Sequence, residues 1–152
     1  GIGKLYSLAT LALNVLDTPA GRLGILIGSD SWYPANYASL NAKGAELIAV
    51  PAFVIGADNW ARPWRGYRTP HLAAHTGAPD DASEGEAWQR LTLTSQAPIS
   101  TARAGVSVFM RGQLWDQGSS GHSFASRDGQ HIVEPLADDK AHHGARLINI
   151  WL

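Results

Sequence analysis

Residues 18–34, which read TPAGRLGILIGSDSWYP, decide the fold of this 152-residue chain. Pro19 fixes one backbone angle and Gly21 can take a positive φ, so the start of this stretch predicts a turn. The apolar run from Leu23 to Ile27 indicates a buried strand, and the run from Leu11 to Asp17 indicates a second one before the turn. The sequence therefore predicts a β-hairpin at this point.

A helix and a further strand are predicted after this hairpin. Pro34 suits the first turn of a helix, with Asp30 or Ser31 as the candidate N-cap, and Gly44 marks the end of the helix. The segment from Glu46 to Val50 is short and apolar, which indicates a buried strand ending before a proline. Because few residues separate the second hairpin strand from the helix, the chain must bend sharply between them.

The rest of the chain mixes predicted helices, strands and loops. A turn at Asp128-Gly129 is a strong signal for a two-residue hairpin. The expected helices cover 86–96 and 99–104, the expected strands cover 106–110, 122–126, 130–133 and 146–152, and the expected loops cover 53–70, 112–121 and 138–144. This order predicts a mixed α/β (α+β) layered structure, with residues 1–152 forming a single domain.

Composition excludes several classes of protein. Hydrophobic residues make up 45% and charged residues 16%, with a formal net charge of -1, which is typical of a globular domain without a nucleic-acid-binding patch. The chain has no cysteine, so it has neither disulfides nor a thiol nucleophile. The apolar stretch from Leu5 to Leu16 is too short for a membrane span and lacks signal-peptide features. We expect a cytoplasmic protein with no membrane partner.

Three motifs in order along residues 14–152 resemble the nitrilase superfamily of carbon–nitrogen hydrolases. The first is the 18–34 stretch, where that family has a Thr-Pro turn, a strand, Cys-x-Asp and an aromatic-Pro pair. The others are Gly44-Ala45-Glu46 with Val50-Pro51, and Gly121-His122-Ser123 with Asp128-Gly129. The resemblance implies a partial nitrilase-type α-β-β-α sandwich and the C-terminal part of a carbon–nitrogen hydrolase-like domain.

The same resemblance implies acyl-transfer chemistry, with two departures. In that family a thiolate attacks an amide or nitrile carbon, a Glu acts as general base and a Lys stabilises the intermediate, with no cofactor. The cysteine position falls on Gly28, and Ala35 stands where a Glu often follows the aromatic-Pro pair. The Glu and Lys belong to the family's N-terminal half, and Lys4 lies closer to the bend than that family's Lys motif does.

Seven residues are candidates for the site. The catalytic candidates are Gly28 at the substituted nucleophile position, Ser29 and Asp30; the candidates for a substrate pocket or an interface are Trp32, Tyr33, Trp60 and Trp64. Ser29 needs a general base, and its neighbour Asp30 suits a helix cap as well as catalysis. The tryptophans suit a core-lining loop equally well. His71 and His75 lack the Glu of a zinc-protease motif, so no metal site is predicted.

Three functional hypotheses follow from these residues. The first is a degenerate member of an amide- or nitrile-hydrolysing family, a pseudoenzyme without its nucleophile. The second is a fragment of an active amidase in which glycine replaces the cysteine in this sequence alone. The third is a non-catalytic binding or assembly subunit. The predicted partners are a small amide or nitrile substrate if the chain is active, and either a homo-oligomer or a partner chain supplying the missing half.

Overall fold

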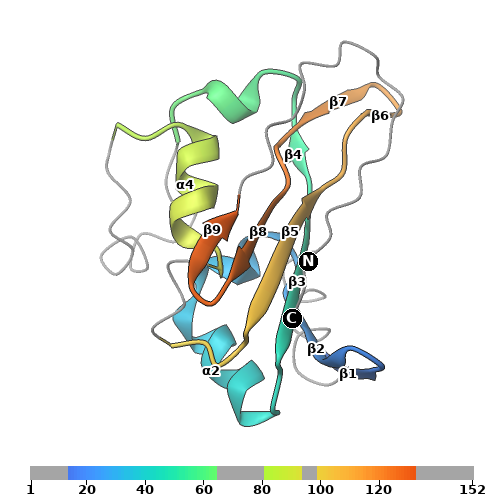
Figure 1. Cartoon of the computed structure of the whole chain (residues 1–152). Coiled ribbons are helices and arrows are strands. Elements are labelled where there is room, and N and C mark those ends of the chain that lie inside the picture. The colour runs from blue at the N-terminus through green and yellow to red at the C-terminus, as the bar shows by residue number, and fades with distance from the viewer. Residues whose placement is uncertain (1–13, 65–80, 94–98, 133–152) are drawn as a thin grey trace.

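The computed structural model describes residues 14–64, 81–93 and 99–132, and within them a six-stranded sheet forms the centre (Figure 1). In spatial order its strands are β1 (Val15–Thr18), β2 (Gly21–Ile25), β3 (Leu47–Ala52), β5 (Ala104–Phe109), β8 (Phe124–Arg127) and β9 (Gln130–Ile132). The three middle strands β2, β3 and β5 run parallel, and the outer strands pair antiparallel. A small second sheet contains β4 (Val54–Ile55), β7 (Gln117–Ser120) and β6 (Gln113–Leu114).

Two helices, α2 (Pro34–Ala42) and α4 (Glu84–Leu91), cover one face of the six-stranded sheet (Figure 1). Gly24 and Gly105 lie in register with the same β3 residue, so they share a face. A β-carbon on Gly24 would lie 2.9 Å from Leu40 of α2, and one on Gly105 would lie 2.6 Å from Leu93 just after α4. Both glycines therefore allow the helix layer to approach the sheet closely.

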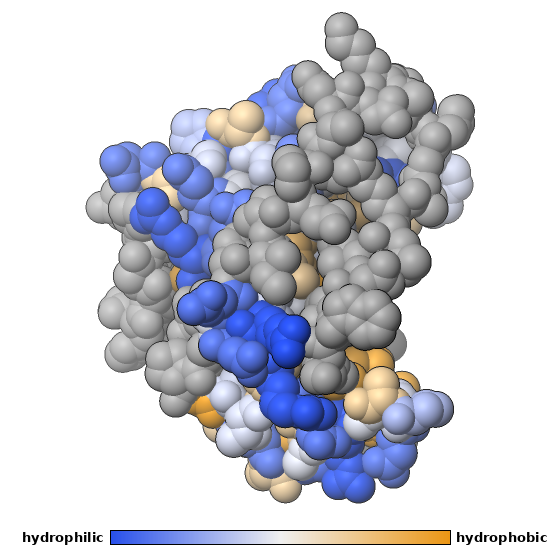
Figure 2. Space-filling model, viewed as in Figure 1, coloured by the Kyte–Doolittle hydropathy of each residue, from blue (hydrophilic) through white to orange (hydrophobic). Residues whose placement is uncertain are grey.

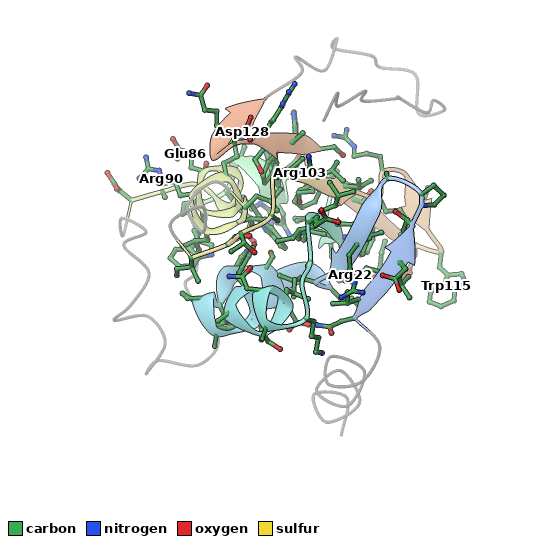
Figure 3. All side chains as sticks on the ribbon, turned by 60° about the horizontal axis from the view of Figure 1, so that its bottom comes forward. Arg22, Glu86, Arg90, Arg103, Trp115 and Asp128 are labelled. Atoms are coloured by element: carbon green, nitrogen blue, oxygen red, sulfur yellow. The ribbon has the colours of Figure 1, made fainter. Side chains whose placement is uncertain are left out.

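The predicted hairpin at the start of the chain is confirmed. β1 and β2 pair antiparallel, and the turn between them ends at Gly21 with φ +128°. Arg22 of β2 donates from Nε to Asp17 Oδ1 at 2.8 Å, and its exposed side chain is labelled in Figure 3. Because both partners are exposed to solvent, this ion pair contributes little to the stability of the fold. Parallel pairing of β2 with β3 joins the hairpin to the rest of the sheet.

The predicted helix after the bend is confirmed as α2, but its predicted cap is wrong. Pro34 occupies the first turn as expected, whereas the N-cap is Tyr33 and makes no side-chain cap hydrogen bond. Asp30 and Ser31 lie instead in a 3-10 helix, η1 (Gly28–Trp32), that precedes α2. The Ser31 hydroxyl does not cap α2, because it bonds to the Gly28 carbonyl within η1 and to the Thr92 hydroxyl beyond it.

The predicted strand over 46–50 is confirmed as β3, but it continues through Pro51 to Ala52. Proline lacks the N–H that a central strand normally donates. Ala49 faces β2, since its carbonyl accepts from Leu26 N at 3.0 Å, and alternation makes Pro51 face the same side. β2 has already ended at Ile25, so the missing N–H of Pro51 has no strand to face there.

Two further expectations are wrong. The expected helix over 99–104 is irregular and leads into β5, because Thr101 donates from N and Oγ1 to Asn41 Oδ1 and Arg103 N donates to Glu46 O. The expected loop over 112–121 contains the β6–β7 hairpin. Its two-residue turn begins with Trp115 at φ +55°, where glycine would be usual.

The remaining predicted elements are confirmed, differ from the structure in their bounds or lie outside the described residues. The Asp128-Gly129 turn is confirmed, with φ values of +49° and +74° between β8 and β9. The helix expected over 86–96 is α4, which begins two residues earlier, because Ser83 and Glu86 form a capping box, and which ends at Leu91, because Thr92 is extended. The expected loop after β3 holds β4 and a 3-10 helix, η2 (Asn59–Ala61). The expected elements over 138–144 and 146–152 lie outside the described residues.

The opposite face of the six-stranded sheet carries apolar side chains. Val106 and Val108 of β5 pair with Ala49 and Pro51 of β3, and all four point away from the helices by strand alternation. Val108 is 49% exposed. Figure 2 shows hydrophobic residues gathered over the β1–β2 end of the same sheet. Within the described residues, no helix has the length and apolar character needed to cross a membrane.

Candidate active site

The bend after β2 is formed by η1, Gly28–Trp32, which we call the elbow. Leu26 still donates to Ala49 of β3, and Ile27 remains extended at φ -95° and ψ 118°. Gly28 then takes φ +55°, and the chain turns away from the direction of β2. The structure thus places Gly28 at the end of a sheet strand and before α2, where the sequence predicted the bend.

The space around Gly28 distinguishes it from the packing glycines of the sheet. A β-carbon built on Gly28 would have no atom of the described residues beyond its chain neighbours within 4 Å, whereas one on Gly24 or Gly105 would collide with a leucine. Glycine at position 28 is therefore favoured by its backbone angle and not by crowding. A larger residue here would carry only the left-handed strain, about 1–2 kcal/mol, and its side chain would extend into open space.

Ser29 and Asp30 follow Gly28 in the elbow. Ser29 is exposed, and no hydrogen bond to its hydroxyl is present in the described part of the chain. The Asp30 carbonyl accepts from Asn36 Nδ2 at 2.8 Å, which ties the elbow to α2. Burial and the neighbouring Asp30 carboxylate raise the pKa of Tyr33, so this phenol stays protonated at neutral pH.

The tryptophans predicted to line a pocket or an interface pack largely into an aromatic cluster of the core. Trp32 of the elbow is buried and meets Trp64 and Trp88 edge to face, with ring centroids 6.1 and 4.8 Å apart. Trp60 meets Phe109 at 4.9 Å in the same manner. Trp60 and Trp64 are partly buried against this core. The structure thus supports the core-lining interpretation for these residues.

His122 lies on the outer side of this cluster. Its ring stacks on Trp60, with centroids 5.4 Å apart and planes at 16°. Arg111 donates from Nη1 to the neighbouring carbonyl of Gly121 at 2.8 Å. Burial, and then the positive charge of Arg111, lower the pKa of His122 below the ordinary value near 6.5. The stacking partner and the lowered pKa describe a packed neutral histidine.

Lowering the pH should reveal the packing of His122 as a loss of folding stability. The unfolded chain binds the His122 proton at a higher pH than the folded chain does, so the folded chain is favoured above about pH 6.5. This contribution is lost as the pH falls through the lowered pKa. We expect the urea midpoint of the native chain to fall more steeply between pH 7 and 5 than that of His122→Gln. Equal slopes for the two proteins would contradict the assignment.

Three buried hydroxyl residues meet at the elbow, a contact that the sequence did not predict: Ser31 in the elbow itself, Tyr37 of α2 and Thr92 after α4. All three side chains are fully buried and hydrogen-bonded to one another's hydroxyl or backbone groups. Tyr37 and Leu40 are three apart on α2, a spacing that would have predicted a buried face. Nothing in the sequence around Thr92 connects it with the elbow 61 residues away.

No metal site accompanies the elbow in the described residues. A cavity of about 20 Å³, roughly the space of one water, lies under Tyr37, Leu93 and Ser126 and does not include Gly28. No group of three metal-ligating side chains occurs within residues 14–64, 81–93 and 99–132. His71, His75 and Lys4 lie outside the described residues.

Comparison with known proteins identifies the class to which this fold belongs. A carbon–nitrogen hydrolase from Helicobacter pylori G27 superposes with a TM-score of 0.52 at 18% identity, covering 80% of this chain and 38% of that one. A cysteine-to-alanine mutant of the Nesterenkonia AN1 amidase, from the nitrilase superfamily, superposes with a TM-score of 0.50 at 20% identity over the same shares. The chain therefore has a nitrilase-type fold, as its motifs implied.

Sequence comparison points the same way over a shorter stretch. The deaminated glutathione amidase of Yersinia enterocolitica is 45% identical over 51 residues, which are 32% of this chain and 18% of that protein. No family model matches the chain. The chain spans well under half the length of these relatives, and the resemblance to carbon–nitrogen hydrolases is confirmed at the level of fold and of this segment.

Proposed function

We propose that this chain is the elbow-bearing, C-terminal part of a carbon–nitrogen hydrolase domain whose nucleophile has been replaced by Gly28. The observation that carries the proposal is the geometry of position 28. It combines a sharp strand-to-helix bend, φ +55° and open space where a side chain would extend. In another structure of the Nesterenkonia amidase, with a TM-score of 0.51, the acetamide moiety of fluoroacetamide adds covalently at the active site cysteine.

The chemistry proposed for a site that keeps its nucleophile is acyl transfer from a small amide or nitrile. A nucleophile at position 28 would attack the carbon, and a general base would be needed within hydrogen-bond reach. Ser29 does not replace the nucleophile in this proposal, since no base bonds to its hydroxyl within the described residues. We propose no cofactor and no metal. The proposal therefore describes a pseudoenzyme, or a glycine variant of an active amidase.

A single engineered thiol tests whether position 28 is open to a small substrate. Because the chain has no cysteine, Gly28→Cys introduces its only thiol. We expect iodoacetamide to modify this thiol in the folded protein at a rate within about tenfold of Ser29→Cys, whose side chain is exposed. Mass spectrometry counts the adducts. Modification of Gly28→Cys only after unfolding in urea would place position 28 in the interior and overturn the proposal.

A second function, a non-catalytic assembly subunit, is favoured by the apolar outer face of the sheet. Val108 and Ile27 are each 49% exposed, and Pro51 beside them is exposed. A sheet face of this kind normally packs against a second layer. We propose that a second copy, or a chain supplying the missing strands, covers it.

Sedimentation velocity tests this assembly. We expect the native chain to associate with increasing concentration and Val108→Lys to weaken that association at least about tenfold, because a charge would be desolvated in the contact. Ile55→Lys is the matched control, since Ile55 is 52% exposed but lies in the small sheet. A native chain that stays monomeric at every concentration would rule out self-association through this face.

A further inference from the structure

We propose that three buried hydroxyl residues, Ser31, Tyr37 and Thr92, hold residue 28 in its left-handed conformation and would act as positioning residues for a side chain introduced at that position. The positioning role rests on the proposed function, because it matters only if position 28 is the nucleophile position. The conformational coupling itself can be measured in the chain as it exists.

The first arm of this network acts on residue 28 directly. Ser31 Oγ donates to the carbonyl oxygen of Gly28 at 2.8 Å. Ser31 Oγ also lies 3.0 Å from Thr92 Oγ1, and since the Ser31 proton is already engaged, Thr92 is the donor. A hydrogen bond to the Gly28 carbonyl fixes the peptide plane that follows residue 28. The direction of a side chain at position 28 follows from that plane.

The second arm holds the elbow from α2. Tyr37 OH donates to the Ser31 carbonyl at 2.9 Å and accepts from Leu93 N at 3.1 Å. Leu93 itself has φ +54°, an unusual backbone turn just after α4, and its N–H points to the phenol. Burial raises the pKa of Tyr37 well above its usual range, so the phenol remains a donor.

Burial makes these bonds hard to replace. Ser31, Tyr37 and Thr92 are each 0% exposed, so water cannot take over a partner that is removed. The network joins the elbow to α2 and to the end of α4. Two of its hydrogen bonds connect residues that lie 61 and 56 positions apart in the sequence. The end of α4 thereby sets the conformation of position 28.

A double-mutant cycle between Gly28→Ala and Thr92→Val tests the inference. Among the described residues beyond its chain neighbours, the added methyl group of Gly28→Ala meets no atom within 4 Å, so we expect its penalty to report backbone strain. In the native background we expect it to lower the urea midpoint. In the Thr92→Val background, where the elbow can relax, we expect the loss caused by Gly28→Ala to fall to half or less. Thr92→Ser, which keeps the hydroxyl, should restore the full loss.

Equal losses in all three backgrounds would overturn the inference, because they would show that Thr92 stabilises the fold without acting on position 28. If Thr92→Val does not fold, Ser31→Ala gives the same cycle through the bond that touches Gly28, with the same two outcomes. The cycle measures stability only. Its result therefore does not depend on hydrolase activity, and failure of the proposed function would appear separately in the labelling of Gly28→Cys.

Discussion

Replacing Trp88 by alanine should destabilise the chain by about 3–5 kcal/mol, the range for loss of a buried aromatic side chain. Trp88 is 4% exposed and joins two parts of the fold. Its ring lies 4.8 Å from that of Trp32 in the elbow and 5.0 Å from that of Phe109 in β5. Its Nε1 also donates to Glu84 Oε1 at 3.1 Å. Removing the ring leaves a cavity between α4, the elbow and the sheet.

The chain contains a matched control for this prediction. Trp115 is 86% exposed at the turn of the β6–β7 hairpin, and Figure 3 shows it standing clear of the ribbon. Trp115→Ala should change the free energy of unfolding by no more than about 0.5 kcal/mol, as is usual for exposed positions. Urea unfolding of both variants gives the comparison. Similar losses for the two tryptophans would show that the aromatic cluster does not hold the fold together.

Restoring the nucleophile should produce the largest functional effect. We expect Gly28→Cys, combined with a polypeptide that supplies the missing strands and the Glu and Lys implied by the family resemblance, to hydrolyse simple amides. The native chain in the same mixture should release no ammonia above the blank. The physical reason is that a thiol at φ +55° with open space around it can reach a substrate, whereas glycine offers no nucleophile.

The control for this rescue is Gly28→Ala with the same complementing polypeptide. It carries the same backbone strain as Gly28→Cys and lacks the sulfur, so it should remain inactive. Hydrolysis by the alanine pair equal to that of the cysteine pair would show that the activity comes from elsewhere.

Local signals explain how much of the fold was predictable. The turn at residues 18–21 and the turn at Asp128-Gly129 depend on residues next to each other, and both hairpins occur as expected. The bend before Pro34 also followed from neighbouring residues. The β6–β7 hairpin was missed because Trp115, rather than a glycine, takes the positive φ of its turn.

The features that the sequence did not predict depend on contacts between residues far apart in the chain. Ser31 was predicted as a possible helix cap, whereas its hydroxyl bonds to Thr92, 61 residues further along the chain. Residues 99–104 were predicted as a short helix, but Thr101 bonds to Asn41 of α2, and the segment runs into a strand. At the candidate site, the family resemblance singled out position 28 as the candidate nucleophile position, whereas the hydroxyl network beside it depends on partners that no sequence spacing relates.

Ammonia release from simple amides by the purified chain, measured beside Ser29→Ala, tests the central claim most directly. The claim is that the elbow of a carbon–nitrogen hydrolase is present here without its nucleophile. It predicts no release above the buffer rate for either protein, because Gly28 carries no reactive group and Ser29 has no base bonded to it within the described residues. Release by the native chain that disappears in Ser29→Ala would contradict the claim and make Ser29 the nucleophile.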